Sequence, residues 1–375
     1  MTSASRQILK KVRWYAREMW GRSAPQPATM HETISQIPEQ DRQKIEYARS
    51  VLSNGTLPSN FSITIGVAPC NYSCLFCPQS ISKPHKALWI DLELLRKCLN
   101  EMPEENVTLN VSSFSETIAA PVLVPAIRLM KEIRPKLPIA MATNGSIFRQ
   151  KVVEDLIEAG LDHYSYSFDA ATPEAYHTLI QVDNFEKAWK NLEQIVELRN
   201  QKKSSMKITT HIMHFKGVEE DFERFKSYWQ DKVDAVVLRR VGNWGGGDQY
   251  GLMDKLEAKG FVPAHYDQPI ERHPCNSIFM HFQLQPDGHY MPCIGTTPDY
   301  KSNPKYSLGH ASEVTWMEAW ARLGEMRRAH LAGRWNEIEA CRTCNIWGLW
   351  EETWFREENQ SGELRFHLAD VPHAS

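Results

Sequence analysis

Three cysteines lie close together in the segment APCNYSCLFCP, at positions Cys70, Cys74 and Cys77. Thiolates at this CxxxCxxC spacing, with no fourth cysteine nearby, can bind three irons of a 4Fe-4S cluster and leave the fourth iron open to another ligand. A zinc site usually takes its ligands in pairs or completes a set of four, and a disulfide framework needs an even number of cysteines in a short secreted chain. The triplet therefore predicts an iron–sulfur cluster with an open iron, and structural zinc is the alternative.

Four more cysteines lie towards the C-terminal end of the chain: Cys275, Cys293, Cys341 and Cys344. The segment Pro286-Asp287-Gly288 predicts a hairpin turn between the first two, and a CxxC contains the last two. Taken alone, four such thiols fit a structural zinc ion and a 4Fe-4S cluster equally well. The remaining cysteine, Cys98, falls among the apolar residues of one predicted helix face, and we expect it to be a buried structural thiol.

The composition is that of an ordinary globular protein with one large and one small domain. The chain has 375 residues, of which 42% are hydrophobic and 24% charged. Its net charge of -3 argues against a protein built to bind nucleic acid, which would normally have a strongly basic domain. No apolar run approaches the length of a membrane span, and the N-terminus lacks the features of a signal peptide. We therefore expect a cytoplasmic protein whose clustered cysteines bind metal rather than form disulfides.

The N-terminal residues 1–22 combine basic side chains, such as Lys10 and Arg13, with aromatic ones, such as Trp14 and Trp20. This pattern predicts a basic helix that packs against the rest of the protein, and peripheral contact with an anionic membrane surface or a partner is the alternative. The Pro-containing stretch 24–30 predicts a linker.

From residue 61 onward, short apolar runs alternate with segments of helical periodicity, which predicts parallel βα units. The expected strands are residues 61–68, 106–112, 138–143, 163–168, 207–213 and 234–240. Between them, apolar residues recur at helical spacing, for example from Phe185 to Val196 and from Phe222 to Trp229. In a barrel built from such units, functional residues lie at the C-terminal ends of the strands.

The cysteine triplet resembles the hallmark of the radical S-adenosylmethionine (radical SAM) superfamily, in which an aromatic residue, here Phe76, precedes the last cysteine. The residues around the second cysteine set, from Leu308-Gly309-His310 through Arg327-Arg328 to the CxxC, are similar to the SPASM extension of these enzymes. Four cysteines correspond to its reduced Twitch form, which binds one auxiliary cluster. The resemblance covers about residues 61–350. It implies an α/β fold, with a partial (β/α)6 TIM-like barrel followed by a small cysteine-rich Twitch/SPASM domain.

These two matches predict the division of the chain. Residues 1–58 are expected to form an N-terminal helical extension, 59–246 the radical SAM barrel, 247–272 a linker, 273–350 the SPASM/Twitch domain and 351–375 a C-terminal tail. The run Gly245-Gly246-Gly247 at the barrel exit is not a phosphate loop, because no GK[ST] follows it.

The resemblance also implies which residues contact SAM, since they follow successive predicted strands. The candidates are Phe76, Ser115, Glu116, Thr143, Asn144, Ser167 and Asp169. Only Glu116 matches the family's Gly-Gly-Glu-Pro-like segment, and the glycines are absent, so a polar turn that caps the next helix is the alternative there. Ser167 and Asp169 are alternate residues of a strand and can point to the same side.

The fifth and sixth predicted strands supply the catalytic candidates His211, His214, Arg239 and Arg240. A histidine on a strand is more often a packing residue than a base, and only one of two adjacent arginines can face the barrel interior.

The resemblance implies that the reduced first cluster binds SAM and cleaves it to a 5′-deoxyadenosyl radical, which abstracts a hydrogen atom from a small-molecule substrate. If that carbon bears a hydroxyl group, loss of a proton to a base and of an electron to the auxiliary 4Fe-4S cluster gives a ketone. At the family level the chain is similar to the aminocyclitol dehydrogenase of butirosin biosynthesis, which favours a sugar or aminocyclitol-like substrate and a flavodoxin or ferredoxin-type electron donor. The alternatives are a radical SAM epimerase with Tyr164 or Tyr166 as hydrogen donor, a peptide-modifying enzyme, a non-catalytic iron–sulfur electron carrier and a zinc-binding structural protein.

Overall fold

The computed structural model describes residues 57–244, 250–264, 272–297 and 301–349, together with the backbone of the hairpin strands β11 (Trp354–Glu358) and β12 (Leu364–Leu368). The predictions for residues 1–22, for the linker 24–30 and for Gly245-Gly246-Gly247 lie outside these residues. Within the part that is described, no helix is long and apolar enough to cross a membrane.

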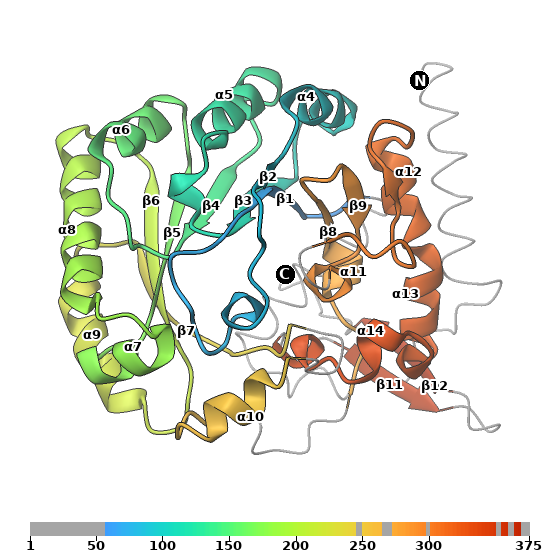
Figure 1. The fold of residues 1–375 in the computed structure, drawn as a ribbon. Helices are drawn as coiled ribbons and strands as arrows, with labels where there is room; N and C mark the ends of the chain where they lie inside the picture. The colour runs from blue at the N-terminus through green and yellow to red at the C-terminus, as the bar shows by residue number, and fades with distance from the viewer. Residues whose placement is uncertain are drawn as a thin grey trace, which may run out of the picture.

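The predicted parallel strands are all present, each within two residues of its expected ends. They are β1 (Asn60–Val67), β3 (Thr108–Phe114), β4 (Ile139–Thr143), β5 (His163–Asp169), β6 (Lys207–Met213) and β7 (Ala235–Arg239). They pair in this order, each parallel to the next (Figure 1). The short strand β2 (Leu88–Trp89) pairs antiparallel with the end of β1. The α/β class and the partial barrel are therefore confirmed.

Helices cover the outer face of this sheet (Figure 1): α4 (Leu92–Glu101), α5 (Leu123–Ile133), α6 (Gln150–Glu158), α7 (Pro173–Ile180), α8 (Phe185–Gln201) and α9 (Glu219–Trp229). Their apolar faces meet the alternate strand residues that point outward. Phe168 of β5, for example, contacts Phe185 and Trp189 of α8 and Phe225 of α9 at ring-centroid distances of 5.1–5.8 Å. Burial of such aromatic surface is the main favourable contribution to this layer.

The inner face of the sheet is polar instead. The strand register pairs Thr64 with Ser112 and Ser167 with His211, and residues paired in parallel strands point to the same side. A parallel sheet with both faces packed would be apolar throughout. The inward-pointing hydroxyl and imidazole groups therefore mark a face that was built to contact something other than a hydrophobic core.

The C-terminal region continues the same sheet. Strands β8 (His281–Leu284), β9 (His289–Met291) and β10 (Gly309–His310) add to it in the order β10-β9-β8-β1, and β8 is parallel to β1. The turn between β8 and β9 contains Pro286-Asp287-Gly288, with Gly288 at a φ of 82°, so the predicted hairpin is confirmed. The sheet thus crosses the expected boundary between barrel and Twitch/SPASM domain.

Five short α-helices follow in the rest of the described part: α10 (Leu252–Glu257), α11 (Ser277–Met280), α12 (Trp316–Arg322), α13 (Gly324–Leu331) and α14 (Glu339–Arg342). A capping box at Thr315 and Glu318 begins α12.

Helix α4 joins the two regions. Lys97 Nζ donates a hydrogen bond to the Ala311 carbonyl at 2.7 Å, and the Trp316 backbone N–H donates to Glu101 Oε2 at 3.0 Å. Cys98 is fully buried at this seam, where its thiol interacts with Tyr290, as expected for a structural cysteine. The barrel strands and the C-terminal region therefore share one hydrophobic core.

We expect Trp316→Ala to destabilise the protein by about 3–5 kcal/mol, the usual cost of emptying a buried tryptophan site. The indole is fully buried against Phe61 and Phe282. Trp316→Phe keeps an aromatic ring and loses only an N–H that has no hydrogen-bond partner among the described residues, so it should cost much less. Thermal unfolding of both variants tests this packing, and equal stability of the two would contradict it.

Candidate active site

The loop that bears Cys70, Cys74 and Cys77 is tied to the ends of β1 and β3 by Gln79. The Gln79 side chain is buried; its Oε1 accepts from the Cys70 backbone N–H at 2.9 Å, and its Nε2 donates to the carbonyls of Ala68 and Phe114. The sequence analysis missed this residue. The signal was an amide side chain two positions after the last cysteine of the triplet.

The far side of the loop is held by α7. The backbone N–H of Leu75 donates to the Leu179 carbonyl at 2.8 Å, and the hydroxyl groups of Tyr72 and Tyr176 lie 2.9 Å apart in the core. Asn184 Nδ2 donates to the Tyr72 hydroxyl at 2.7 Å. The conformation of the loop is thus set by protein contacts on both sides.

The three thiols of this loop share an environment that disfavours a free thiolate. Burial raises the pKa of each, to about 12 for Cys77, and the neighbouring cysteines raise the pKa of Cys74 further. Such thiols lose their protons when a cation binds. The donor set therefore fits an iron site, which supplies the missing positive charge.

Among the described residues, no group of three or more His, Cys, Asp or Glu side chains is placed to hold one metal ion.

Glu116 joins the ends of β3 and β4. Its carboxylate is only 2% exposed; Oε1 accepts from the Ile118 N–H at 3.1 Å and from the Thr143 hydroxyl, and Oε2 accepts from the Asn144 N–H at 2.7 Å. Burial raises the pKa of this carboxyl group to about 7. Asn144 in turn donates from Nδ2 to Cys70 Sγ at 3.6 Å. The structure thus brings Glu116, Thr143 and Asn144 together beside the cysteine loop. The Glu116 carboxylate holds the other two residues in place through its hydrogen bonds.

Two other predicted SAM contacts lie in the loops around this group. Ser115 Oγ is 3.2 Å from the Ser113 hydroxyl, within the polar turn that follows β3. Phe76 is 8% exposed, and its carbonyl accepts a hydrogen bond from Trp244 Nε1 at 2.6 Å.

Gly145 makes the tight turn after β4. Its φ is +72°, and a Cβ added there would lie 2.0 Å from Cζ of Tyr166. The Tyr166 hydroxyl and Asn191 Nδ2 both lie 2.8 Å from the Gly145 carbonyl oxygen.

Tyr166 and Tyr164 are fully buried on the side of β5 that faces the helices, opposite to His211. The structure does not bring these two tyrosines to the polar inner face.

Asp169, His211 and Arg239 meet on that inner face. Asp169 lies at a bulge in β5 with a φ of +69°, and its Oδ1 is 3.3 Å from His211 Nε2. Arg239 Nη1 is 3.5 Å from the same nitrogen. Burial lowers the pKa of His211, partly offset by Asp169 and reinforced by Arg239. The imidazole is therefore neutral near pH 7 and can accept a proton.

The remaining two catalytic candidates point elsewhere. His214 Nε2 lies 3.5 Å from Glu219 Oε1 at the start of α9. Arg240 lies just beyond β7, which ends at Arg239. Of the four candidates, His211 and Arg239 are the ones that the structure places together.

The second cysteine set also comes together. Cys275 precedes α11, Cys293 follows β9, and Cys341 and Cys344 lie at the end of α14. Burial raises the pKa of all four thiols, and that of Cys275 is raised further by the other three. The Ile346 backbone N–H lies 3.4 Å from Cys344 Sγ. Four mutually interacting thiols are a complete ligand set for one cluster.

Asn243 and Trp244 connect the two cysteine loops. Asn243 Nδ2 donates to the Thr343 carbonyl at 2.9 Å, and the Asn243 backbone N–H donates to Asn345 Oδ1 at 2.8 Å. Asn345 returns a backbone hydrogen bond to Asn243 Oδ1 at 3.2 Å. Since Trp244 donates to the Phe76 carbonyl, two adjacent residues after β7 contact both loops.

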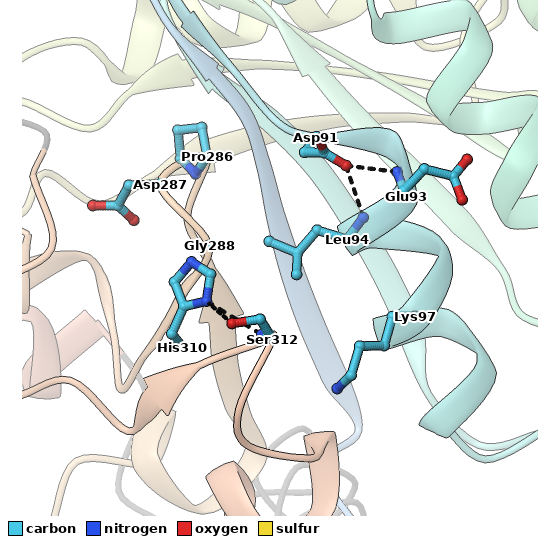
Figure 2. A pocket seen from close by; sticks show the side chains of 9 residues that line it. All are labelled: Asp91, Glu93, Leu94, Lys97, Pro286, Asp287, Gly288, His310 and Ser312. Atoms are coloured by element: carbon cyan, nitrogen blue, oxygen red, sulfur yellow. Dashed lines mark hydrogen bonds between the residues drawn. The ribbon is translucent and has the colours of Figure 1, made fainter.

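An open pocket of about 500 Å³ lies elsewhere, between the start of α4 and the β8–β9 turn (Figure 2). Its polar groups are engaged locally: Asp91 caps α4, and His310 Nδ1 lies 2.7 Å from the Ser312 hydroxyl. None of the predicted site residues lines it. It belongs to the seam between α4 and the C-terminal region.

The structure combines a parallel α/β barrel, whose first loop bears three cysteines, with a four-cysteine unit on the same sheet. This combination defines a class of iron–sulfur enzymes. Residues 67–227 match the family model described as the radical SAM superfamily, and residues 275–345 match the SPASM model, an iron-sulfur cluster-binding domain. The chain therefore contains a radical SAM domain and a SPASM domain. Its cofactors are therefore S-adenosylmethionine and 4Fe-4S clusters.

Sequence similarity to the curated relatives extends over only part of this chain. A GTP 3′,8-cyclase of Crocosphaera subtropica is 25% identical over 136 residues, which cover 34% of this chain and 40% of the relative. A biotin synthase of Salinispora arenicola is 22% identical over 142 residues, which cover 36% of this chain and 41% of the relative. The chain thus spans about two fifths of the length of these curated relatives.

Solved structures share the fold over a larger part. Streptococcus suis SuiB, bound to the precursor peptide SuiA, has a TM-score of 0.55 at 13% identity and covers 93% of this chain and 84% of its own. BtrN in complex with AdoMet and 2-DOIA has a TM-score of 0.49 at 16% identity over 77% of this chain and 94% of its own. The identity to SuiB is so low that this likeness speaks to the fold alone.

We expect Gly145→Ala to disrupt the turn that positions Asn144, because the added Cβ meets both an unfavourable φ and the Tyr166 ring. Gly217→Ala is the matched control: its φ is +81°, but nothing lies within 4 Å of the added Cβ. The control should cost about 1–2 kcal/mol from backbone strain alone. Gly145→Ala should lower the melting temperature further and weaken SAM binding. Equal effects of the two substitutions would show that the Tyr166 contact does not constrain the turn.

Proposed function

We propose that this protein is a radical SAM oxidoreductase that oxidises a C–OH group of a small polar substrate, of sugar or aminocyclitol type, to a carbonyl. Cys70, Cys74 and Cys77 would hold the cluster that binds SAM, and the four C-terminal cysteines would hold the auxiliary cluster. When bound, these groups supply a 5′-deoxyadenosyl radical that removes a hydrogen atom from carbon and a one-electron acceptor for the second oxidation step.

The observation on which the proposal mainly rests is the four-thiol auxiliary site. Four cysteine ligands leave no open iron for a substrate, so such a site is suited to electron transfer. Oxidation of a carbinol needs this acceptor, because removal of one hydrogen atom accounts for only half of the two electrons lost. An epimerase would return a hydrogen atom to carbon instead. Its candidate donors Tyr164 and Tyr166 lie on the helix side of β5.

The inner face supplies the groups that the chain itself would use. His211 is held neutral by burial and would take the hydroxyl proton, while Asp169 orients the imidazole. Arg239 brings a positive charge to within 3.5 Å of the same nitrogen and would stabilise the developing alkoxide. The hydroxyl groups of Ser112 and Ser167 on this face suit a polyhydroxylated ligand more than an apolar one.

The SAM contacts remain part of this proposal. Asn144 would act beside the open cluster, Ser167 and Asp169 at the end of β5, and Ser115 and Phe76 in the flanking loops. Glu116 would act through Thr143 and Asn144, since its oxygens are already engaged. A flavodoxin or ferredoxin-type protein of the cytoplasm is the proposed electron donor.

The first test is iron content and SAM cleavage after anaerobic reconstitution. The full protein should contain about eight irons per chain, four in each cluster, and form 5′-deoxyadenosine with dithionite. Replacing Cys70, Cys74 and Cys77 with alanine should leave about four irons and abolish cleavage. Replacing the four C-terminal cysteines should also leave about four irons but retain cleavage. About four irons in the unsubstituted protein, with SAM intact, would favour a non-catalytic iron–sulfur carrier.

The second test separates the base from the radical step. Screening sugars and aminocyclitols for carbonyl formation identifies the substrate. His211→Gln should then lower product formation by about 100-fold or more while 5′-deoxyadenosine still forms. His214→Gln is the control. Its side chain lies beside Glu219 at the start of α9, so this variant should retain activity.

The pH profile gives a further check on the base. Because the pKa of His211 is lowered, its neutral form persists below the ordinary imidazole value of about 6.5. The rate of product formation should therefore begin to fall only below that pH. An acid limb centred above 6.5, or equal losses in the two histidine variants, would exclude His211 as the base.

A further inference from the structure

Arg272 is fixed against the backbone of the auxiliary cysteine loop. Its Nη1 donates to the Arg342 carbonyl at 3.0 Å, and its Nη2 donates to the Cys341 carbonyl. The guanidinium carbon lies 5.2 Å from the ring centroid of Trp335 and 5.7 Å from that of Trp347. Two aromatic rings and two carbonyls thus hold this positive charge in one place.

No carboxylate among the described residues forms an ion pair with Arg272. Its Nε is buried and has no hydrogen-bond partner in that part of the chain. A partly buried cation without an anion is unfavourable. The groups that it contacts directly are the carbonyls of Cys341 and Arg342, on the loop that bears two of the four C-terminal cysteines.

His330 presents a second unused donor at the same site. Its ring is fully buried, and Nδ1 accepts the backbone N–H of Cys275 at 3.2 Å. An imidazole that accepts at Nδ1 has its proton on Nε2. His330 Nε2 is buried without a partner among the described residues. A buried N–H, on a ring whose other nitrogen contacts the backbone of Cys275, is therefore available to an acceptor that the described residues do not provide.

We propose that Arg272 and His330 compensate the negative charge of the auxiliary cluster and raise its reduction potential, which makes it an electron acceptor. This inference rests on the proposed assignment of the four cysteines as its ligands. A cluster with four thiolate ligands is anionic and becomes more so on reduction. A fixed positive charge and an N–H donor beside it stabilise the reduced state more than the oxidised one.

The experiment measures the midpoint potential of the auxiliary cluster alone. In the full-length chain with Cys70, Cys74 and Cys77 replaced by alanine, the potential is followed by electron paramagnetic resonance during an anaerobic redox titration. Arg272→Gln should shift the midpoint to a lower potential, and Arg272→Lys, which keeps the charge, should shift it less. The control Arg334→Gln removes an exposed arginine paired with Glu337 in the same domain and should leave it unchanged.

His330→Asn provides an independent measurement, because the asparagine oxygen can still accept the Cys275 N–H while the Nε2–H is lost. It should also lower the potential. Unchanged midpoints in Arg272→Gln and His330→Asn, at full iron content, would overturn the inference. If the Arg272→Gln variant does not bind iron, the midpoint potentials of Arg272→Lys and His330→Asn test the inference instead. Because no substrate is needed, a failure here is distinct from a failure of substrate oxidation, whereas absence of any cluster in the parent protein would overturn both proposals.

Discussion

A buried carboxylate determines how the first cysteine loop meets the sheet. Glu116 accepts hydrogen bonds from the Thr143 hydroxyl and from the Ile118 and Asn144 backbone N–H groups, and so holds the end of β4 against the end of β3. Asn144, fixed in this way, contacts Cys70. The strand register and one desolvated side chain therefore place the loop before any cofactor binds. This is preorganisation, in which the protein meets the cost of ordering during folding rather than during ligand binding.

The two cysteine sites belong to a single framework. They are linked by the continuous sheet through β1 and β8, by α4, and by Asn243 and Trp244 between the loops themselves. Trp244 adopts a φ of +61°, an unfavourable conformation for a tryptophan, in order to reach the Phe76 carbonyl. Contacts on three sides oppose any independent movement of the C-terminal region. Such rigidity suits a protein in which an electron must cover a fixed separation between sites.

The sequence predicted the sheet well because apolar runs, turns and helical periodicity are local properties. The strands, the β8–β9 turn and the buried position of Cys98 follow from such patterns. The contacts of Arg272 and the pairing of β8 with β1 could not be predicted, since each depends on partners that are distant along the chain or on backbone groups that no pattern of side chains reveals. The choice between His211 and His214 likewise depended on which face each residue takes at the end of β6. Local patterns thus located the site, while tertiary contacts assigned its parts.

The parallel pairing of β8 with β1 also bears on biosynthesis. Ser59 and Met280, which are hydrogen-bonded where these strands begin, are 221 residues apart. Until β8 has left the ribosome, β1 presents unpaired backbone groups along that side, and exposed strand edges promote aggregation. The C-terminal hairpin is therefore a cap for the barrel as well as a carrier of cysteines. A chain cut before β8 would lose this edge cover along with Cys293, Cys341 and Cys344.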